Sequence, residues 1–174
     1  MGEHNEIRAV LPQRHPMLLV DRVLALEPGR SIRTVKLVSA TEPCYADLPE
    51  SAEPWRFAYP RSLLIESFGQ SAALLWLGDS PPPDDDGVLM FAGARDWHFA
   101  GSAYPGDVLR HEVHLDSVVA DTAFAHGETW IGDRRVATVG TLIATRRPVA
   151  RPAVPPSGVA HPHPMVSVST EGQR

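Results

Sequence analysis

The segment YPRSLLIESFGQSAALLWLG, residues 59–78, constrains the fold more than any other part of the sequence. It contains no proline between Pro60 and Leu77 and is too long for a typical strand, so it is predicted to be a helix. Pro60 suits a first helical turn, and Gly78 suits the position after the last turn. A helix that is apolar on nearly all sides must be covered by other elements. Its one carboxylate, Glu66, must therefore be neutralised, paired with another group or used in catalysis, because a buried unpaired charge is costly.

The rest of the chain reads mainly as β-strands. Apolar or alternating segments separated by turn residues are typical of antiparallel sheets. Strands are expected at residues 17–26, 31–38, 87–99, 107–120, 122–131 and 135–146, after a short helical turn at residues 4–11. The predicted fold is α+β, with a curved antiparallel sheet of about six strands wrapped around one long central helix.

Length and composition fit one domain with a hydrophobic core. The chain has 174 residues, of which 43% are hydrophobic and 21% are charged, and its formal net charge is −5. We predict a domain over residues 1–147. Six prolines follow within residues 148–174, and proline removes backbone donors and blocks helix, so this tail is expected to be disordered or extended.

Several classes of function are disfavoured. A mildly acidic chain without a basic cluster is a poor candidate for binding nucleic acid. Cys44 is the single cysteine, which excludes an intrachain disulfide, and the scattered histidines lack zinc-ligand spacing, so no metal is expected. Neither a GxGxxG motif nor a P-loop occurs, and no cofactor is expected. Without a membrane-spanning apolar run or a secretory signal at the N-terminus, we expect a cytoplasmic protein with no membrane partner.

Four motifs carry a resemblance to a known family. They are QRHPMLLVDRV at residues 13–23, TEPCYADLP at 41–49, PRSLLIESFGQSAALL at 60–75 and YPGDVLRHEV at 104–113. Together, and in this order, they resemble the FabZ-type 3-hydroxyacyl-(acyl carrier protein) dehydratases over roughly residues 7–147. The resemblance implies a hot-dog fold, a dimer, and a substrate carried as an acyl-phosphopantetheine thioester on acyl carrier protein, in fatty-acid or polyketide-type assembly.

The resemblance also implies a mechanism. In the family, a histidine of one subunit removes the C2 proton of the thioester, and a helix carboxylate of the other subunit helps water leave from C3. Glu66 matches that carboxylate, and Gln70, which shares its helix face, matches the family's glutamine. Pro60 and Arg61 stand where the family has a Pro-Gly pair, and in the family backbone N–H groups near this helix N-terminus polarise the thioester carbonyl. Arg61 departs from that pattern, since glycine allows the closest backbone approach.

The larger departure concerns the catalytic histidine. The family places it in a Gly-His-Phe-Pro loop just after Asn-Glu-Pro, whereas residues 41–49 contain no histidine and the loop is about one residue shorter. Asp47 stands nearest the missing histidine, and His98 could enter the tunnel from a strand, so both are candidates for a replacement base. His111 and His114 are expected at or near the surface.

Three functions remain open from the sequence. The chain could be one subunit of a heterodimer in which a histidine-bearing paralogue completes the site. It could be a non-catalytic protein that binds or scaffolds an acyl chain or carrier protein. It could also be a thioester enzyme with a replaced base, because one fold hosts several chemistries. Glu66 could instead be a structural acid paired with Arg or Tyr, and Gln70 could satisfy backbone groups. Since a positioned general base contributes ~10²–10⁴ in rate, we expect the chain alone to be a weak or inactive dehydratase.

Overall fold

In this computed structural model, residues 3–78 and 87–148 are described. They form a six-stranded antiparallel sheet in the order β1-β2-β4-β5-β6-β3. The strands are β1 Arg22–Glu27, β2 Ser31–Leu37, β3 Gly87–Phe99, β4 Val108–Val119, β5 Thr122–Ile131 and β6 Arg134–Pro148. The helices are α1 His4–Val10 and α2 Arg61–Leu77, with single 3₁₀ turns at Pro43–Tyr45 and Pro54–Phe57.

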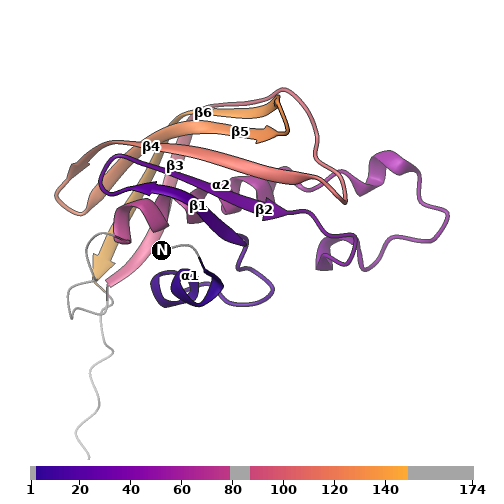
Figure 1. Cartoon of the computed structure of the whole chain (residues 1–174), viewed down its shortest axis with the longest axis horizontal. Helices are drawn as coiled ribbons and strands as arrows, with labels where there is room; N and C mark the ends of the chain where they lie inside the picture. Colours follow the sequence, from indigo (N-terminus) through magenta and orange to yellow (C-terminus); the bar gives the residue numbers. More distant parts are fainter. Residues whose placement is uncertain (1–2, 79–86, 149–174) are drawn as a thin grey trace, which may run out of the picture.

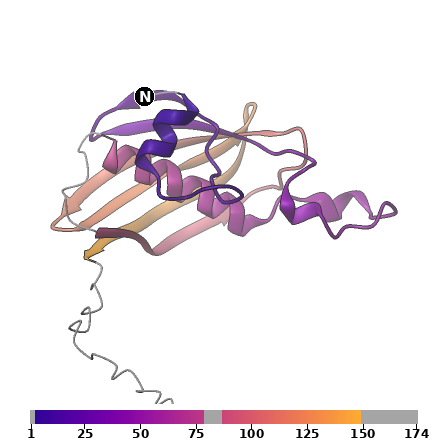
Figure 2. The ribbon, with the colours of Figure 1, turned by 90° about the horizontal axis from the view of Figure 1, so that it is seen from below.

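The sheet curves over α2, which confirms the predicted hot-dog fold (Figure 1). Seen from below, α2 lies against the concave face, and α1 lies beside it (Figure 2). Neither helix in the described ranges has the length and hydropathy needed to span a membrane. The predicted disorder of the tail concerns residues beyond Pro148, which lie outside the described part of the chain.

Aromatic and aliphatic side chains of α2 fill the space beneath the sheet. Phe68 is fully buried and meets the ring of Trp97 from β3 edge-on, with ring centroids 5.5 Å apart. Leu74 and Leu75 are buried in the same core cluster. Burying each such side chain stabilises the fold by about 1.5–3 kcal/mol, so the apolar sequence of α2 accounts for its central place.

Strand β3 forms an edge of the described sheet, with β6 as its neighbour. Edge strands present unpaired backbone groups, and proteins usually protect them with charge or cover. Here the edge carries apolar side chains instead: Val88, Met90 and Phe91 are about half exposed, Phe91 at 50%. Edge and apolar surface together favour pairing with another chain.

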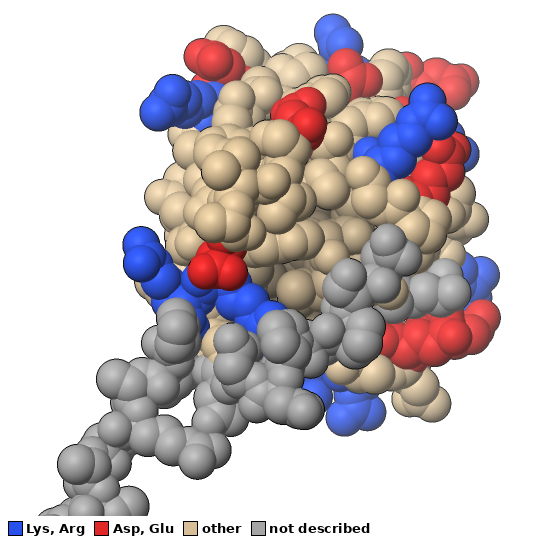
Figure 3. Space-filling view, turned by 90° about the vertical axis from the view of Figure 1, so that its left-hand side faces the viewer, with Lys and Arg blue, Asp and Glu red and all other residues tan. Residues whose placement is uncertain are grey.

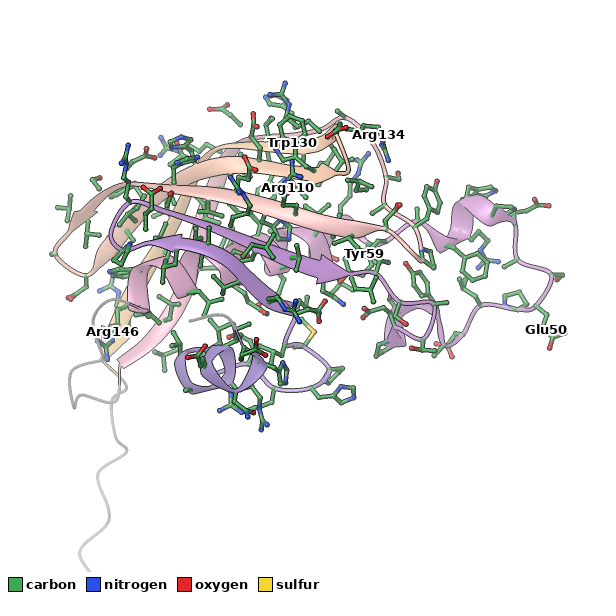
Figure 4. All side chains as sticks on the ribbon, in the orientation of Figure 1. Glu50, Tyr59, Arg110, Trp130, Arg134 and Arg146 are labelled. Carbon is green, nitrogen blue, oxygen red and sulfur yellow. The ribbon has the colours of Figure 1, made fainter. Side chains whose placement is uncertain are left out.

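The connection between β2 and α2 extends beyond the end of the sheet (Figure 1). Tyr59 lies near its base and Glu50 at its tip (Figure 4). The base is held in a core cluster that includes Tyr45 and Tyr59, and the Tyr45 ring lies 5.8 Å from that of Phe57. Trp55, by contrast, is 68% exposed.

The end of the molecule on the left of Figure 1 shows basic and acidic side chains interspersed around neutral surface (Figure 3). Among the described residues on this face, no broad area of one charge is visible. The described part of this face therefore carries charges of both signs.

One glycine allows α2 to approach the sheet closely. A Cβ added to Gly127 in β5 would lie 2.0 Å from the backbone oxygen of Glu112 and 3.1 Å from Cζ of Phe68. A backbone atom cannot move aside cheaply, so a side chain at this position would push β4 or α2 outward.

We predict that Gly127→Ala lowers the free energy of unfolding by at least about 2 kcal/mol, through overpacking. Gly93→Ala in β3 is the matched control, because no atom lies within 4 Å of its added Cβ. That control should stay within about 0.5 kcal/mol of the parent. Urea unfolding of both variants checks the prediction, and equal stabilities would contradict it.

Candidate functional site

Glu66 lies in the second turn of α2, half-buried, and two side-chain amides hold it. Nε2 of Gln70 donates to Oε1 of Glu66 at 2.8 Å, and Nε2 of Gln13 donates to the same oxygen at 3.3 Å. Neither Arg nor Tyr pairs with it among the described residues. The carboxylate is therefore held by neutral donors on one oxygen, and in the described chain no hydrogen bond reaches Oε2.

The orientation of Gln70 is fixed by the backbone that it contacts. The N–H of Leu19 donates to Oε1 of Gln70 at 2.8 Å, and Nε2 of Gln70 donates to the carbonyl oxygen of Met17 at 2.7 Å. A backbone N–H can only donate, so the amide oxygen must face Leu19 and the amide nitrogen must face Glu66. Gln70 thus satisfies backbone groups and positions Glu66 at the same time.

The N-terminus of α2 keeps free backbone donors. Pro60 is the N-cap and has no capping side chain, and its carbonyl accepts from the N–H groups of Leu63 and Leu64. The N–H groups of Arg61 and Ser62 have no acceptor among the described residues. Such unpaired donors at a helix N-terminus can bind a carbonyl oxygen or an anion.

The side chain of Arg61 lies against Phe99 of β3. Its guanidinium carbon lies 4.7 Å from the centroid of the Phe99 ring, in cation–π geometry. This contact directs the side chain of Arg61 toward β3.

Neither candidate replacement base is hydrogen-bonded to Glu66 within the described residues. Asp47 is exposed in the projecting loop between β2 and α2. His98 is exposed on β3, between Trp97 and Phe99, whose rings stack on one face of the sheet at 5.9 Å. Because Trp97 packs on α2 and strand side chains alternate, His98 faces the outer side of the sheet.

The expectation that His111 lies at the surface is wrong. His111 is completely buried, while His114 is exposed as expected. Its Nε2 lies 2.6 Å from Oγ of Ser67 on α2, and its Nδ1 lies 2.9 Å from Oγ1 of Thr129 on β5. The sequence held a signal that was missed: Leu109 and Val113, two residues away on either side, are apolar and define the inward face of β4.

Burial also decides the charge of His111. Desolvation lowers its pKa from 6.5 to about 3, so the ring is neutral at ordinary pH. The ring of Phe68 lies edge-on to it, with centroids 5.8 Å apart. A fully enclosed neutral imidazole, with both ring nitrogens in contact with protein side chains, is not placed to reach a substrate.

A buried ion pair anchors the start of the projecting loop. Nζ of Lys36 donates to Oε1 of Glu42 at 2.5 Å, and both side chains are about nine-tenths buried. Burial, followed by the charge of Glu42, raises the pKa of Tyr59 nearby. The hydroxyl of Tyr59 has no partner among the described residues. Sequence reasoning had assigned no role to Lys36, because its partner lies beyond the end of its own strand.

The described residues contain no group of three or more His, Cys, Asp or Glu side chains arranged to hold a metal ion. Around Glu66 the described residues supply the carboxyl group and two side-chain amides, and the free backbone donors lie at the start of the same helix. A carboxyl group can transfer a proton, and free backbone donors can polarise a carbonyl.

Comparison with known proteins shows which family the sequence resembles. Residues 11–140 match the FabA-like domain family. The 3-hydroxyacyl-[acyl-carrier-protein] dehydratase FabZ of Symbiobacterium thermophilum is 37% identical over 124 residues, which cover 71% of this chain and 83% of that protein. FabZ of Paracidovorax citrulli is 35% identical over 153 residues, which cover 86% of this chain and all of that protein.

Among solved structures, the dehydratase heterocomplex ApeI:P from Xenorhabdus doucetiae superposes with a TM-score of 0.65 and 18% identity. The superposition covers 81% of this chain and 90% of that chain. At this level of identity the likeness establishes the fold.

We predict an acid-sensitive contribution to stability from His111. Its folded pKa of about 3 lies below the unfolded value of 6.5, so the unfolded state binds the proton first as pH falls. Stability from this residue is complete above pH 6.5 and is lost toward pH 3, with a slope of up to about 1.4 kcal/mol per pH unit. His111→Gln should lack this slope. Free energies of unfolding measured from pH 4.5 to 7.5 check it, and parallel curves for both proteins would contradict it.

Proposed function

The chain belongs to the FabA-like family, as a FabZ-like 3-hydroxyacyl-(acyl carrier protein) dehydratase domain with a hot-dog fold, and from this premise we propose how it acts. It works as one subunit of a two-chain dehydratase, to which it contributes Glu66, while a histidine-bearing paralogue contributes the base. The substrate is a 3-hydroxyacyl thioester on acyl carrier protein.

The observation that carries this proposal is the contrast between two halves of one site. The carboxylate half is ordered by hydrogen bonds: Gln70 and Gln13 hold Glu66, and backbone groups fix Gln70 in turn. Residues 41–49 contain no histidine, so on this proposal the base half comes from the other chain. A site formed by two chains explains both facts, since one complete pair needs a histidine from one chain and a carboxylate from the other.

In the proposed reaction, the partner's histidine takes the C2 proton, and the electrons of the C2–H bond form the C2=C3 double bond. The C3–O bond breaks, and the hydroxyl leaves as water with a proton from Glu66. Oε1 of Glu66 already accepts two amide donors, so the transferred proton resides on Oε2. A positioned acid of this kind typically contributes ~10²–10⁴ in rate.

Two surfaces support association with a second hot-dog chain. The apolar edge of β3 can continue the sheet into a partner, and the projecting loop can reach it with Trp55. The similar structure from Xenorhabdus doucetiae is a dehydratase heterocomplex, which supports the proposal that this chain also acts with a second chain. A non-catalytic carrier-binding protein would use the same surfaces, but it would not need the ordered amides around Glu66.

We predict that Glu66→Gln, in a complex with a histidine-bearing dehydratase paralogue, lowers dehydration of a 3-hydroxyacyl carrier protein by ~10²-fold or more. Glutamine keeps the size of the side chain but removes the transferable proton. The melting temperature should change little, and the chain without its partner should show weak or no turnover.

Melting temperature and turnover are measured on the same preparations. Thr34→Val serves as a control, because it removes a buried hydrogen bond to Ser71 without touching Glu66. A folded Glu66→Gln complex with full activity would reject the catalytic role. Robust turnover by the pure chain, lost in Asp47→Asn or His98→Gln, would show a replaced base instead, and ligand binding without turnover in any complex would favour the scaffold role.

We also predict that Phe91→Arg weakens self-association or pairing with the paralogue by on the order of tenfold or more, because it places a charge on the apolar edge of β3. Val119→Arg is the matched control, since Val119 is even more exposed, at 63%, but lies at the end of β4, away from the β3 edge. Light scattering and sedimentation check the prediction. Equal association of the two variants would contradict the proposed interface.

A further inference from the structure

A series of hydrogen bonds, interrupted only at the Cα of Leu19, links β5 to the carboxylate of Glu66. It passes from Thr129 to His111, from His111 to Ser67, and from Ser67 to the carbonyl of Leu19. From the N–H of Leu19 it continues to Gln70 and then to Glu66. We propose that His111 is a positioning residue, whose neutral ring orients this series and thereby holds Glu66 in place.

The direction of every hydrogen bond follows from the backbone of Leu19. Its carbonyl can only accept, so Ser67 gives it the one hydroxyl proton that a serine has, at 3.0 Å. Oγ of Ser67 must then accept from His111, which requires a proton on Nε2. Nδ1 of His111 is left without a proton and accepts from the hydroxyl of Thr129. The structure thus assigns the Nε2–H tautomer to His111.

On the other side of Leu19 the donors point the same way. The N–H of Leu19 donates to Oε1 of Gln70, and Nε2 of Gln70 donates to Glu66. All five donors therefore point from β5 toward the carboxylate. Aligned hydrogen bonds polarise one another within each of two stretches, Thr129–His111–Ser67 and Leu19–Gln70–Glu66. Between the stretches the coupling is positional, because the carbonyl and the N–H of Leu19 belong to different peptide groups and together fix the backbone of that residue. The series ends on Oε1, which leaves Oε2 as the oxygen that faces the reaction.

Burial leaves these side chains no alternative hydrogen-bond partners. His111, Ser67 and Thr129 are all fully buried, so water cannot replace a lost partner. The neutral state of His111 has the same origin, since burial lowers its pKa to about 3. The edge-on ring of Phe68 further limits rotation of the imidazole.

A second buried pair on the same helix provides a matched control. Oγ1 of Thr34 lies 2.7 Å from Oγ of Ser71, which donates to the backbone oxygen of Ser67 at 2.9 Å. These side chains are equally buried, but they contact neither Leu19 nor Gln70. Thr34→Val therefore costs a buried hydrogen bond of the same kind without interrupting the series.

The first test does not depend on activity. Long-range ¹H–¹⁵N spectra of the folded protein should show His111 neutral, with the proton on Nε2, from pH 5 to 8. The side-chain amide protons of Gln70 should exchange slowly with solvent in the parent, in His111→Gln and in Thr34→Val, and faster in His111→Phe. Glutamine retains a donor toward Ser67, whereas phenylalanine keeps the ring and removes it. A proton on Nδ1, or unchanged Gln70 exchange in His111→Phe, would overturn the proposal.

The second test rests on the proposed function and uses the mixed complex with the paralogue. His111→Phe should lower kcat by on the order of tenfold with little change in KM, because Glu66 is misplaced rather than lost. His111→Gln should restore most of the activity, and Thr34→Val should keep full activity despite a lower melting temperature. Equal losses of kcat in His111→Phe and Thr34→Val would show that His111 has only a structural role. If the parent complex shows no turnover, the proposed function fails, and the spectra still decide the role of His111.

Discussion

The structure depends on how a nearly all-buried helix accommodates its polar side chains. α2 must be covered on most sides, yet it carries Ser67, Gln70 and Ser71 in its buried surface. An unsatisfied buried polar group costs about 1–3 kcal/mol, which is a large share of a domain's stability. Each of these side chains therefore requires a specific partner on the sheet or on the segment before β1. The position of that segment, and with it Gln13, follows from this requirement.

Much of the fold could be predicted from local pattern. The helix was expected at residues 60–77 and runs over Arg61–Leu77, because length, apolar content and the absence of proline all favour it. The largest error in a strand boundary is instructive. β1 was expected from residue 17 but begins at Arg22, since the backbone of Leu19 is bonded to Gln70 and Ser67 and cannot join the sheet ladder. Side chains 48 or more residues away decide that boundary, and no local pattern contains them.

The site was also predictable only in part, because local spacing contains some of its contacts but not those between residues far apart in the sequence. The spacing of Glu66 and Gln70 predicts a shared helix face, and the two side chains are hydrogen-bonded. Their catalytic and binding roles stay predictions. The third partner, Gln13, could not be inferred, because it is 53 residues away from Glu66. His111 was misplaced because a polar residue in a strand was read as exposed, although the strand's apolar alternation pointed inward. Its burial is tolerable because Ser67 and Thr129 satisfy both ring nitrogens.

The central claim is that this chain supplies the carboxylate of Glu66 to an active site whose histidine belongs to another chain. In a mixed dimer, the paralogue's own helix carboxylate would face the loop of residues 41–49, which has no histidine. The most direct measurement is the dehydration rate of the mixed complex after that carboxylate of the paralogue is changed to its amide. The account predicts that turnover of the mixed complex is unchanged, while the paralogue's homodimer loses activity by ~10²-fold or more. Loss of activity in the mixed complex as well would contradict it, because Glu66 would then not be the working acid.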